Sequence, residues 1–212
     1  MKNAGRMQGI ERKRIVPAAT VEQAEDAVRL ADALLNGGLD VLEITFRTDA
    51  ALEAIRRVAR RFPQMLIGAG TLLTADQLRR AADAGAKFGV APGLNEDMIR
   101  LAAGTGMVFI PGVATPTETD RGIAAGCRIL KFFPAEALGG VKMLKAMAAP
   151  FAHTGVKFLP TGGIDASNAG SYLDLPFVAA VGGSWMVAAG LIKERNWAEV
   201  TRLTREALSC AG

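Results

Sequence analysis

The sequence predicts an α/β protein whose eight parallel strands close into a (β/α)8 barrel, the TIM-barrel architecture. Eight short apolar segments recur along the 212 residues, and amphipathic helical segments separate them. Strands that alternate with helices pair in parallel, because each helix returns the chain to the same edge of the sheet. Eight such units average about 26 residues each, close to the minimum length of one unit. An open, doubly wound sheet is the alternative that this pattern leaves.

The predicted strands are short and apolar, which is typical of strands that are buried on both faces. They are expected at residues 14–18, 40–46, 64–68, 87–90, 107–110, 128–133, 156–159 and 177–181. Three of the helical segments between them start at residues that commonly cap helices: 74–84 at Thr74, 95–103 at Asn95 and 116–124 after Thr115. A further helix is expected at residues 21–36, with Thr20 in its N-cap region and Gly37 as its C′ residue.

The composition is that of one globular domain covering residues 1–212. Half of the residues are hydrophobic and 22% are charged, so a large core can form and disorder is not expected. No linker, low-complexity tract or shift in composition marks a second domain. Residues 1–13 precede the first predicted strand and are expected to form an N-terminal extension or helix.

The charge pattern does not indicate a nucleic-acid or membrane partner. The net charge is +4 and the isoelectric point is about 9.3. Several cations lie close to the N-terminus, but no interleaved aromatic side chains or binding motif accompany them. The longest uncharged run, residues 177–192, is short for a membrane span and contains Gly182-Gly183. A small anionic substrate fits the mildly basic charge.

Cysteine and histidine are too few for a disulfide framework, a zinc site or a His-based catalytic triad. The chain has two cysteines, Cys127 and Cys210, and one histidine, His153. Few cysteines without a pairing pattern are typical of a reducing compartment, so a cytoplasmic location is expected. No apolar segment of a secretory signal follows the N-terminal cations.

Lys131 is a charged residue inside the apolar run of residues 129–133. Removing an ammonium group from water costs several kcal/mol unless the group is paired or neutralised. Burial also lowers the pKa of a lysine, which leaves more of the free amine that attacks carbonyl groups to form Schiff bases. The alternative is a structural lysine that reaches solvent or pairs with a carboxylate.

Polar side chains share one face of the second predicted strand. Side chains alternate along a strand, so Glu43, Thr45 and Arg47 lie on the face opposite to the apolar residues between them. Strands two and six of a barrel lie opposite each other, so Glu43 is expected to approach Lys131 at the carboxyl ends of the strands. A carboxylate there offers proton transfer beside the amine. The alternative is a Glu43–Arg47 pair that fills the interior.

Paired glycines follow the seventh and eighth predicted strands. Thr161-Gly162-Gly163 follows the seventh, and Gly182-Gly183-Ser184 follows the eighth. Glycine lets the backbone approach an anion closely and present N–H groups to it. Barrels often build a phosphate site from these two loops and a short extra helix, which residues 184–189 could supply. Tight turns without a ligand are the alternative.

Two further strand ends carry polar groups. The segment Gly68-Ala69-Gly70-Thr71 suits a carboxylate or carbonyl oxygen, and a simple turn fits it equally well. Glu136 could serve as a second acid or base, although a carboxylate at the start of a helix is the simpler account.

Several segments, in family order and over nearly the whole chain, make the sequence similar to a known family. They are LEITFRT (42–48), GAGT (68–71), APGL (91–94), PGVATPTE (111–118), LKFFPAE (130–136), PTGGI (160–164) and GGSW (182–185). The chain resembles the 2-dehydro-3-deoxy-6-phosphogluconate (KDPG) aldolases, a family that also includes 4-hydroxy-2-oxoglutarate (KHG) aldolases. The resemblance implies a compact (β/α)8 barrel, a class I aldolase without metal or other cofactor, and a homotrimer.

The resemblance also implies a role for each candidate residue. Lys131 would form the Schiff base, and Glu43 would act as general acid and base. The substrate-binding residues would be Arg47 and Thr71 at the carboxylate of pyruvate, Phe133 against the substrate, and Thr161, Gly162, Gly163, Gly183 and Ser184 around the phosphate. Residues 15–22, the first passage from strand to helix, are about three residues shorter than in the family pattern and contain no cation, although this loop contributes one in some family members. This departure bears on substrate affinity and specificity and leaves the residues of the core chemistry in place.

The implied reaction is cleavage of KDPG, a phosphorylated keto acid, to pyruvate and glyceraldehyde 3-phosphate, with cleavage of KHG to pyruvate and glyoxylate as a second activity. Three alternatives remain open. The substrate could be 2-dehydro-3-deoxy-6-phosphogalactonate, which differs only in stereochemistry at C4. A phosphosugar isomerase or epimerase could use Glu43 as a base without a covalent intermediate. A protein that binds such metabolites without catalysis is the third.

Overall fold

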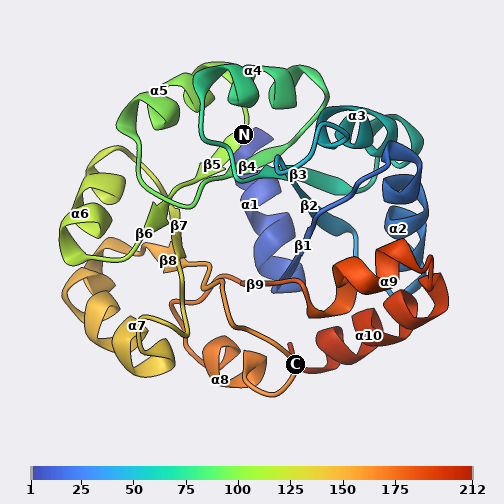
Figure 1. The fold of residues 1–212 in the computed structure, drawn as a ribbon. Helices are drawn as coiled ribbons and strands as arrows, with labels where there is room; N and C mark the ends of the chain where they lie inside the picture. The colour runs from blue at the N-terminus through green and yellow to red at the C-terminus, as the bar shows by residue number, and fades with distance from the viewer. Residues whose placement is uncertain (1, 212) are drawn as a thin grey trace.

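Parallel strands lie inside the molecule and helices surround them (Figure 1). The computed structural model describes the backbone of residues 2–211 and the side chains of residues 5–211. Its strands are β1 (Ile15–Ala19), β2 (Val41–Thr45), β3 (Leu66–Gly70), β4 (Phe88–Val90), β5 (Val108–Ile110), β6 (Gly112–Val113), β7 (Ile129–Phe132), β8 (Lys157–Phe158) and β9 (Val181–Gly183). Its helices are α1 (Lys2–Lys13), α2 (Ala24–Asn36), α3 (Ala51–Arg61), α4 (Ala75–Asp83), α5 (Glu96–Thr105), α6 (Pro116–Ala124), α7 (Gly140–Ala148), α8 (Ala169–Leu173), α9 (Ala189–Lys193) and α10 (Trp197–Ser209).

The strands form two parallel sheets that curl around a common interior (Figure 1). Six strands pair in the order β5-β4-β3-β2-β1-β9, and three pair in the order β6-β7-β8. Only Pro111 separates β5 from β6, so the chain itself joins the sheets on one side. On the other side, isolated bridges connect Phe158 to Val178 and Thr161 to Gly182. The predicted α/β class with a parallel sheet is confirmed.

The last strand lies further along the chain than predicted. The sequence predicts a strand at residues 177–181, whereas β9 covers Val181–Gly183 and Val178 makes an isolated bridge. The reason is the pairing of β9 with β1, in which Val16 lies opposite Gly182. Pairing with β1 therefore gives Gly182 and Gly183 a strand conformation, although the local sequence pattern indicates a loop.

Helix α1 crosses the end of the sheet where the strands begin (Figure 1). Its Glu11 carboxylate lies 2.9 Å from the Nζ of Lys157, the first residue of β8. Ile10 on the same helix is completely buried. A helix thus occupies the stretch for which the sequence predicts an extension or helix, with Met1 outside the described residues.

Three predicted helix starts are confirmed. Thr74 and Thr115 each form a capping box with the side chain three residues further on. The Asn95 side chain accepts a hydrogen bond from the N–H of Met98. In each case the cap supplies an acceptor to an N–H group that the first turn of a helix leaves unpaired.

Helix α2 differs from its prediction at both ends. It begins after Gln23, whose side chain makes no capping hydrogen bond. Thr20 shares a 2.8 Å hydrogen bond with Thr45 instead of capping the helix, because it follows β1 and lies beside the end of β2. At the other end Gly38, with φ of 95°, takes the left-handed conformation that was expected at Gly37.

Loss of the Thr115 cap is expected to lower the free energy of unfolding by about 0.5–2 kcal/mol. In Thr115→Ala the N–H of Glu118 loses the hydroxyl that accepts its 3.2 Å hydrogen bond. Thr117→Ala is the matched control, because Thr117 is exposed within the same helix. Chemical denaturation followed by circular dichroism measures both variants, and equal stability of the two would contradict the role of the cap.

Candidate active site

A cavity of about 320 Å³ lies at the carboxyl ends of the strands. All the candidate site residues line it: Glu43, Arg47, Thr71, Lys131, Phe133, Thr161, Gly162, Gly163, Gly183 and Ser184. They belong to, or directly follow, β2, β3, β7, β8 and β9. The fold therefore brings together residues from five distant parts of the sequence.

Lys131 on β7 is buried in the wall of this cavity, with 7% of its surface exposed. Its backbone N–H donates to the carbonyl of Pro111 over 2.8 Å, which fixes the strand position. Its Nζ lies 4.8 Å from the centre of the Phe133 ring, and no carboxylate among the described side chains approaches it within 4.0 Å. Burial lowers the pKa of Lys131 below its ordinary value of 10.5, and the charge of Glu43 opposes this shift.

Glu43 on β2 is the buried carboxyl group of the cavity, with 3% of its surface exposed. Burial raises its pKa above the ordinary value of 4.5, while the charges of Lys131 and Arg47 oppose that rise. Burial thus favours the neutral forms of both groups, a free amine and a carboxylic acid. A buried amine and a buried carboxyl group with shifted pKa values in one cavity mark a candidate site for acid–base chemistry.

Glycines on β3 make the room that Glu43 occupies. Gly68 and Gly70 point to the same face of the strand, because side chains alternate with a period of two. A Cβ on Gly70 would lie 1.9 Å from Oε1 of Glu43, and a Cβ on Gly68 would lie 2.3 Å from Cζ of Phe88. Because Gly70 and Gly68 have no side chain, the Glu43 carboxyl group fits beside Gly70 and the ring of Phe88 fits beside Gly68.

Gly70→Ala is expected to lower kcat by about 10²-fold, because the added methyl group must displace the Glu43 carboxyl group by the order of 1 Å. Gly104→Ala is the matched control, since a Cβ at Gly104 in α5 meets nothing within 4 Å. Steady-state kinetics of both variants, with circular dichroism to verify folding, measures the effect. A folded Gly70→Ala protein with unchanged kcat would show that the position of Glu43 does not matter.

The mouth of the cavity carries a guanidinium group and a hydroxyl group. Arg47 is exposed and lies between this cavity and a neighbouring groove of about 590 Å³. Thr71 has a φ of 56°, in the left-handed region that residues other than glycine seldom adopt. Such backbone strain persists where the surrounding structure enforces it, and it is concentrated at functional sites. A planar guanidinium with a hydroxyl in the same cavity is suited to binding a carboxylate.

The two glycine pairs differ in conformation. Gly162, with φ of 100°, and Gly163, with φ of 77°, adopt left-handed dihedral angles that glycine reaches without strain. Gly183 is instead the last residue of β9. A short helix does lie within residues 184–189, as expected, but it is the single 3₁₀ turn Trp185–Val187, and the α-helix α9 begins only at Ala189.

Some residues of the cavity received no binding role from the sequence: Ala18, Thr20, Thr45, Ile164, Val187 and Ala189. Thr20 and Thr45 are the polar members of this group, and their hydroxyl groups are 2.8 Å apart. The alternation along β2 identifies Thr45, which shares a face with Glu43. Thr20 was hidden by its interpretation as a helix cap. The cation nearest in sequence to the loop between β1 and α2 is Arg14. It lies at the opposite end of β1, and its guanidinium group donates to the carbonyl of Leu173.

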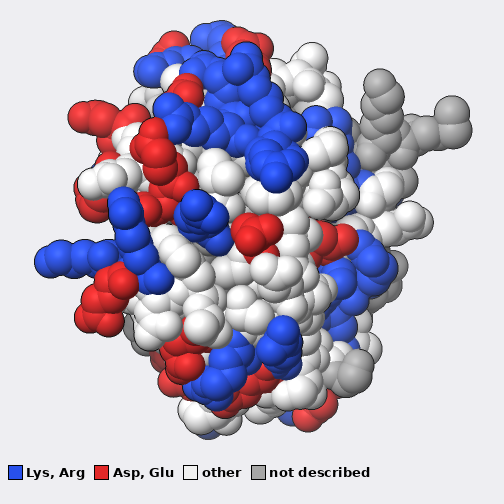
Figure 2. Space-filling view, turned by 90° about the vertical axis from the view of Figure 1, so that its right-hand side faces the viewer, with Lys and Arg blue, Asp and Glu red and all other residues white. Residues whose placement is uncertain are grey.

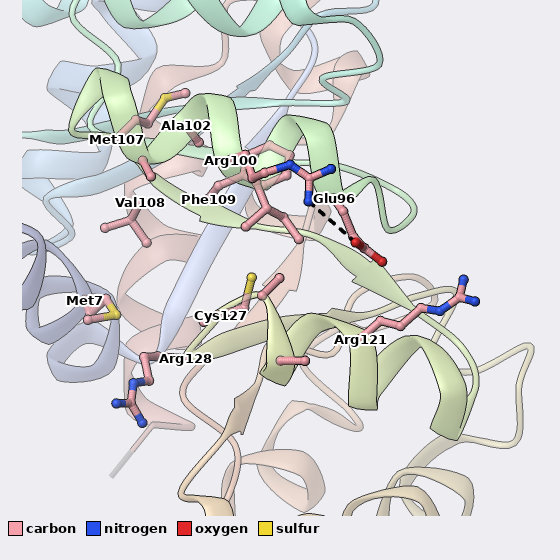
Figure 3. A pocket seen from close by; sticks show the side chains of 15 residues that line it. Met7, Glu96, Arg100, Ala102, Met107, Val108, Phe109, Arg121, Cys127 and Arg128 are labelled. Carbon is pink, nitrogen blue, oxygen red and sulfur yellow. Dashed lines mark ion pairs between the residues drawn. The ribbon is translucent and has the colours of Figure 1, made fainter.

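A second cavity, of about 640 Å³, lies between α5 and α6 at the other end of the strands (Figure 3). Its lining is largely apolar, and its Glu96 carboxylate and Arg100 guanidinium pair with each other at 3.6 Å. Burial raises the pKa of the Cys127 thiol to about 11, so the thiol stays protonated near neutral pH. This cavity therefore lacks the reactive groups that the first one has.

Charged side chains crowd the side of the molecule that is formed by α2, α3, α9 and α10 (Figure 2). Basic side chains gather in the upper part of this view, and acidic ones lie among and below them. Arg57 of α3 pairs with Glu25 of α2, and Arg195, which follows α9, bonds to the buried Asp26 of α2 at 3.1 Å. These pairs connect helices at the surface, so we assign them a structural role.

Neither a metal cluster nor a membrane-spanning helix is found in the described part of the chain. No group of three or more His, Cys, Asp or Glu side chains there is arranged to hold a metal ion. None of its helices is both long enough and apolar enough to cross a membrane.

Comparisons with known proteins identify the family of this chain. A family model described as KDPG and KHG aldolase matches residues 7–203. The chain is 44% identical over 205 residues to a 2-dehydro-3-deoxy-phosphogluconate aldolase of Treponema pallidum, with 97% of each chain covered. It is also 44% identical over 197 residues to a KHG/KDPG aldolase of Escherichia coli K12, with 93% of this chain and 92% of the relative covered.

A solved structure of a KDPG aldolase from Legionella pneumophila has the same fold, with a TM-score of 0.91 and 40% identity over 95% of this chain and 97% of that one. That crystal structure holds pyruvate captured as a covalent carbinolamine intermediate. The fold, the site and these relatives define the protein as an aldolase, which is a carbon–carbon lyase. Within this class, the chain belongs to the KDPG and KHG aldolase family.

Proposed function

We propose that this aldolase cleaves KDPG to pyruvate and glyceraldehyde 3-phosphate through a Schiff base on Lys131. The observation that carries the proposal is a buried amine with a lowered pKa that shares a cavity with a buried carboxyl group, Glu43. Burial shifts this amine toward its free, neutral form, which is the nucleophile that covalent catalysis at a ketone needs. The covalent pyruvate carbinolamine in the Legionella relative supports the same chemistry.

The reaction proceeds in two halves. The neutral amine of Lys131 attacks the C2 ketone of the substrate, and the resulting carbinolamine loses water to give an iminium ion. Glu43 takes the proton of the C4 hydroxyl group, directly or through water, and the C3–C4 bond breaks. The electron pair of the broken C3–C4 bond moves toward the iminium nitrogen to give an enamine, while C4 leaves as the aldehyde carbon of glyceraldehyde 3-phosphate. Protonation of C3 and hydrolysis of the iminium ion then release pyruvate and the free amine.

The other residues of the cavity bind the substrate in this proposal. Arg47 and Thr71 hold the carboxylate of the pyruvate half, and Phe133 packs against the substrate. The phosphate lies against backbone N–H groups and hydroxyls of the loops: Thr161, Gly162, Gly163, Gly183 and Ser184. The iminium ion itself accepts the electron pair of the broken bond, so the proposed reaction needs no metal or other cofactor.

Borohydride treatment in the presence of pyruvate tests the proposal. Reduction of the Schiff base is expected to leave a pyruvate-sized covalent adduct on the peptide that contains Lys131, detected by mass spectrometry. A folded protein without an adduct would contradict the proposal. An isomerase or epimerase that uses Glu43 would then turn over its substrate without an adduct, and a binding protein would bind it without turnover.

Relative cleavage rates define the substrate range. KDPG and its galactonate-derived epimer differ only at C4, and KHG lacks the phosphate. We propose KDPG as the preferred substrate and KHG as a second substrate, because the glycine turn at Gly162 and Gly163 is suited to a phosphate. The Escherichia coli relative is named for both substrates.

Cleavage is expected to decline as pH falls, with a midpoint below 10.5. Burial lowers the pKa of Lys131, so the free amine is present below the ordinary value of 10.5 and is lost as pH falls through the lowered pKa. Glu43 must be ionised to accept a proton, so its raised pKa also makes cleavage decline as pH falls. Because Lys131 and Glu43 interact, the apparent pKa values of the profile belong to the pair and not to either residue alone. The pH profile of kcat/KM measures this decline. A midpoint near 10.5 would show that the reacting amine is not buried.

For the architecture, we propose a single (β/α)8 barrel domain over residues 1–212 that assembles as a homotrimer in the cytoplasm. The isolated bridges of Phe158 with Val178 and of Thr161 with Gly182 support closure of the two sheets into a barrel. The free thiols of Cys127 and Cys210 are consistent with a reducing compartment. The trimer rests on the family resemblance, and a mass three times 22.2 kDa by light scattering is the expected result.

A further inference from the structure

Glu136 lies directly against the glycine turn of the active site. Its backbone N–H donates to the carbonyl of Gly162 over 3.1 Å. A Cβ on Gly163 would come within 2.7 Å of its Cβ and 2.8 Å of its Cγ, so the stem of the glutamate packs on the turn. The residue as a whole is exposed, and it does not line the cavity that Gly162 and Gly163 line. Its negative charge is therefore close to the proposed phosphate site but outside it.

Tyr172 holds this carboxylate from the other side. Tyr172 belongs to α8, is completely buried, and donates its hydroxyl hydrogen to Oε1 of Glu136. A Cβ on Gly140 would lie 3.1 Å from Oε1 of Glu136 and 3.3 Å from the hydroxyl oxygen of Tyr172, so a glycine at this position leaves room for the pair. The contact joins two segments that are 36 residues apart in the sequence.

We propose that Tyr172 is a positioning residue that holds the Glu136 carboxylate away from a phosphate bound at the Gly162–Gly163 turn. The inference rests on the proposed function, because it concerns the phosphate of the substrate. An untethered glutamate side chain rotates about its own bonds and brings its charge toward the turn on which it packs. Like charges a few ångströms apart near a protein surface repel each other enough to weaken binding by about three- to tenfold.

The test compares substrates with and without a phosphate. In Tyr172→Phe the KM for KDPG is expected to rise about three- to tenfold with little change in kcat, and the rise shrinks at high ionic strength. The KM for KHG and the yield of the pyruvate adduct stay unchanged. Adding Glu136→Gln to Tyr172→Phe restores the KM for KDPG, because it removes the charge. Glu136→Gln alone leaves that KM at or below the wild-type value.

A merely structural role gives a different pattern. If Tyr172 only packs the core, Tyr172→Phe raises the KM of both substrates together, and Glu136→Gln does not rescue it; either outcome overturns the inference. Failure of the proposed function is a separate result, since it appears as a missing pyruvate adduct in the wild-type protein. A wild type that forms the adduct but has equal KM for KDPG and KHG would overturn the phosphate site and this inference with it.

A readout without turnover is available because Tyr172 is the only tyrosine in the chain. Burial and the bond to Glu136 raise the pKa of its phenol above the ordinary value of 10.0. Phenolate absorbance therefore titrates a single group. Ionisation at a lower pH in Glu136→Gln than in the wild type is expected, and identical titration curves would show that the carboxylate does not hold the hydroxyl.

Discussion

Replacement of Lys131 by methionine is expected to abolish cleavage and the borohydride adduct while leaving the fold at least as stable. The variant removes the nucleophile, and no other residue of the cavity supplies an amine. Methionine has nearly the length of lysine and fills the same space without a charge. Because a buried ammonium group without a close partner costs free energy, its removal is expected to preserve or raise the free energy of unfolding.

Kinetics, adduct mass and chemical denaturation together measure this result. Lys157→Met is the matched control, since Lys157 starts the neighbouring strand β8 but pairs with Glu11 of α1 outside the cavity. It is expected to retain both cleavage and the adduct. Residual cleavage by Lys131→Met at a rate within tenfold of the wild type would mean that the reaction does not pass through this amine.

Glu43→Gln is expected to lower kcat by about 10²–10⁴-fold, because glutamine cannot accept the proton of the C4 hydroxyl group. The amide keeps the size of the carboxyl group, so it fits the space beside Gly70 that a larger side chain would not. The adduct with pyruvate is expected to form, since the amine of Lys131 remains. Single-turnover cleavage and adduct yield measure the two effects separately.

A second measurement on Glu43→Gln uses the coupling between the two groups. The charge of Glu43 raises the pKa of Lys131, against the larger effect of burial. Its loss is therefore expected to move the midpoint for adduct formation to lower pH. A kcat that changes less than tenfold, or a midpoint that moves to higher pH, would contradict the assigned role of Glu43.

The strand periodicity of two was enough to predict the inward face of β2. It grouped Glu43, Thr45 and Arg47, and the structure has all three in one cavity. Lys131 stood out for a different reason, because a charge in an apolar strand costs free energy. This signal alone left a structural lysine as the alternative, and the Schiff-base role came from the family resemblance. These signals are local, so they are visible in one segment at a time.

Features that depend on a neighbouring segment escaped prediction. The bounds of β9 depend on pairing with β1, and Thr20 pairs with Thr45 from another strand. The contact between Tyr172 and Glu136 likewise has no local pattern, since neither residue constrains the other until the chain folds. The barrel closure and the trimer could be expected only from the whole pattern of elements and from family resemblance.

Helix α1 covers the end of the sheet that faces away from the cavity. Its Ile10 is buried in the core, and its Glu11 pairs with Lys157 of β8. Each central strand thus has one end committed to holding the molecule together and one end free to carry chemistry. Substitutions at the covered end change stability with no direct effect on the substrate, and substitutions at the open end change the reaction with little cost to the core. Substitutions in single loops at the carboxyl ends of the strands can therefore change substrate preference without altering the fold.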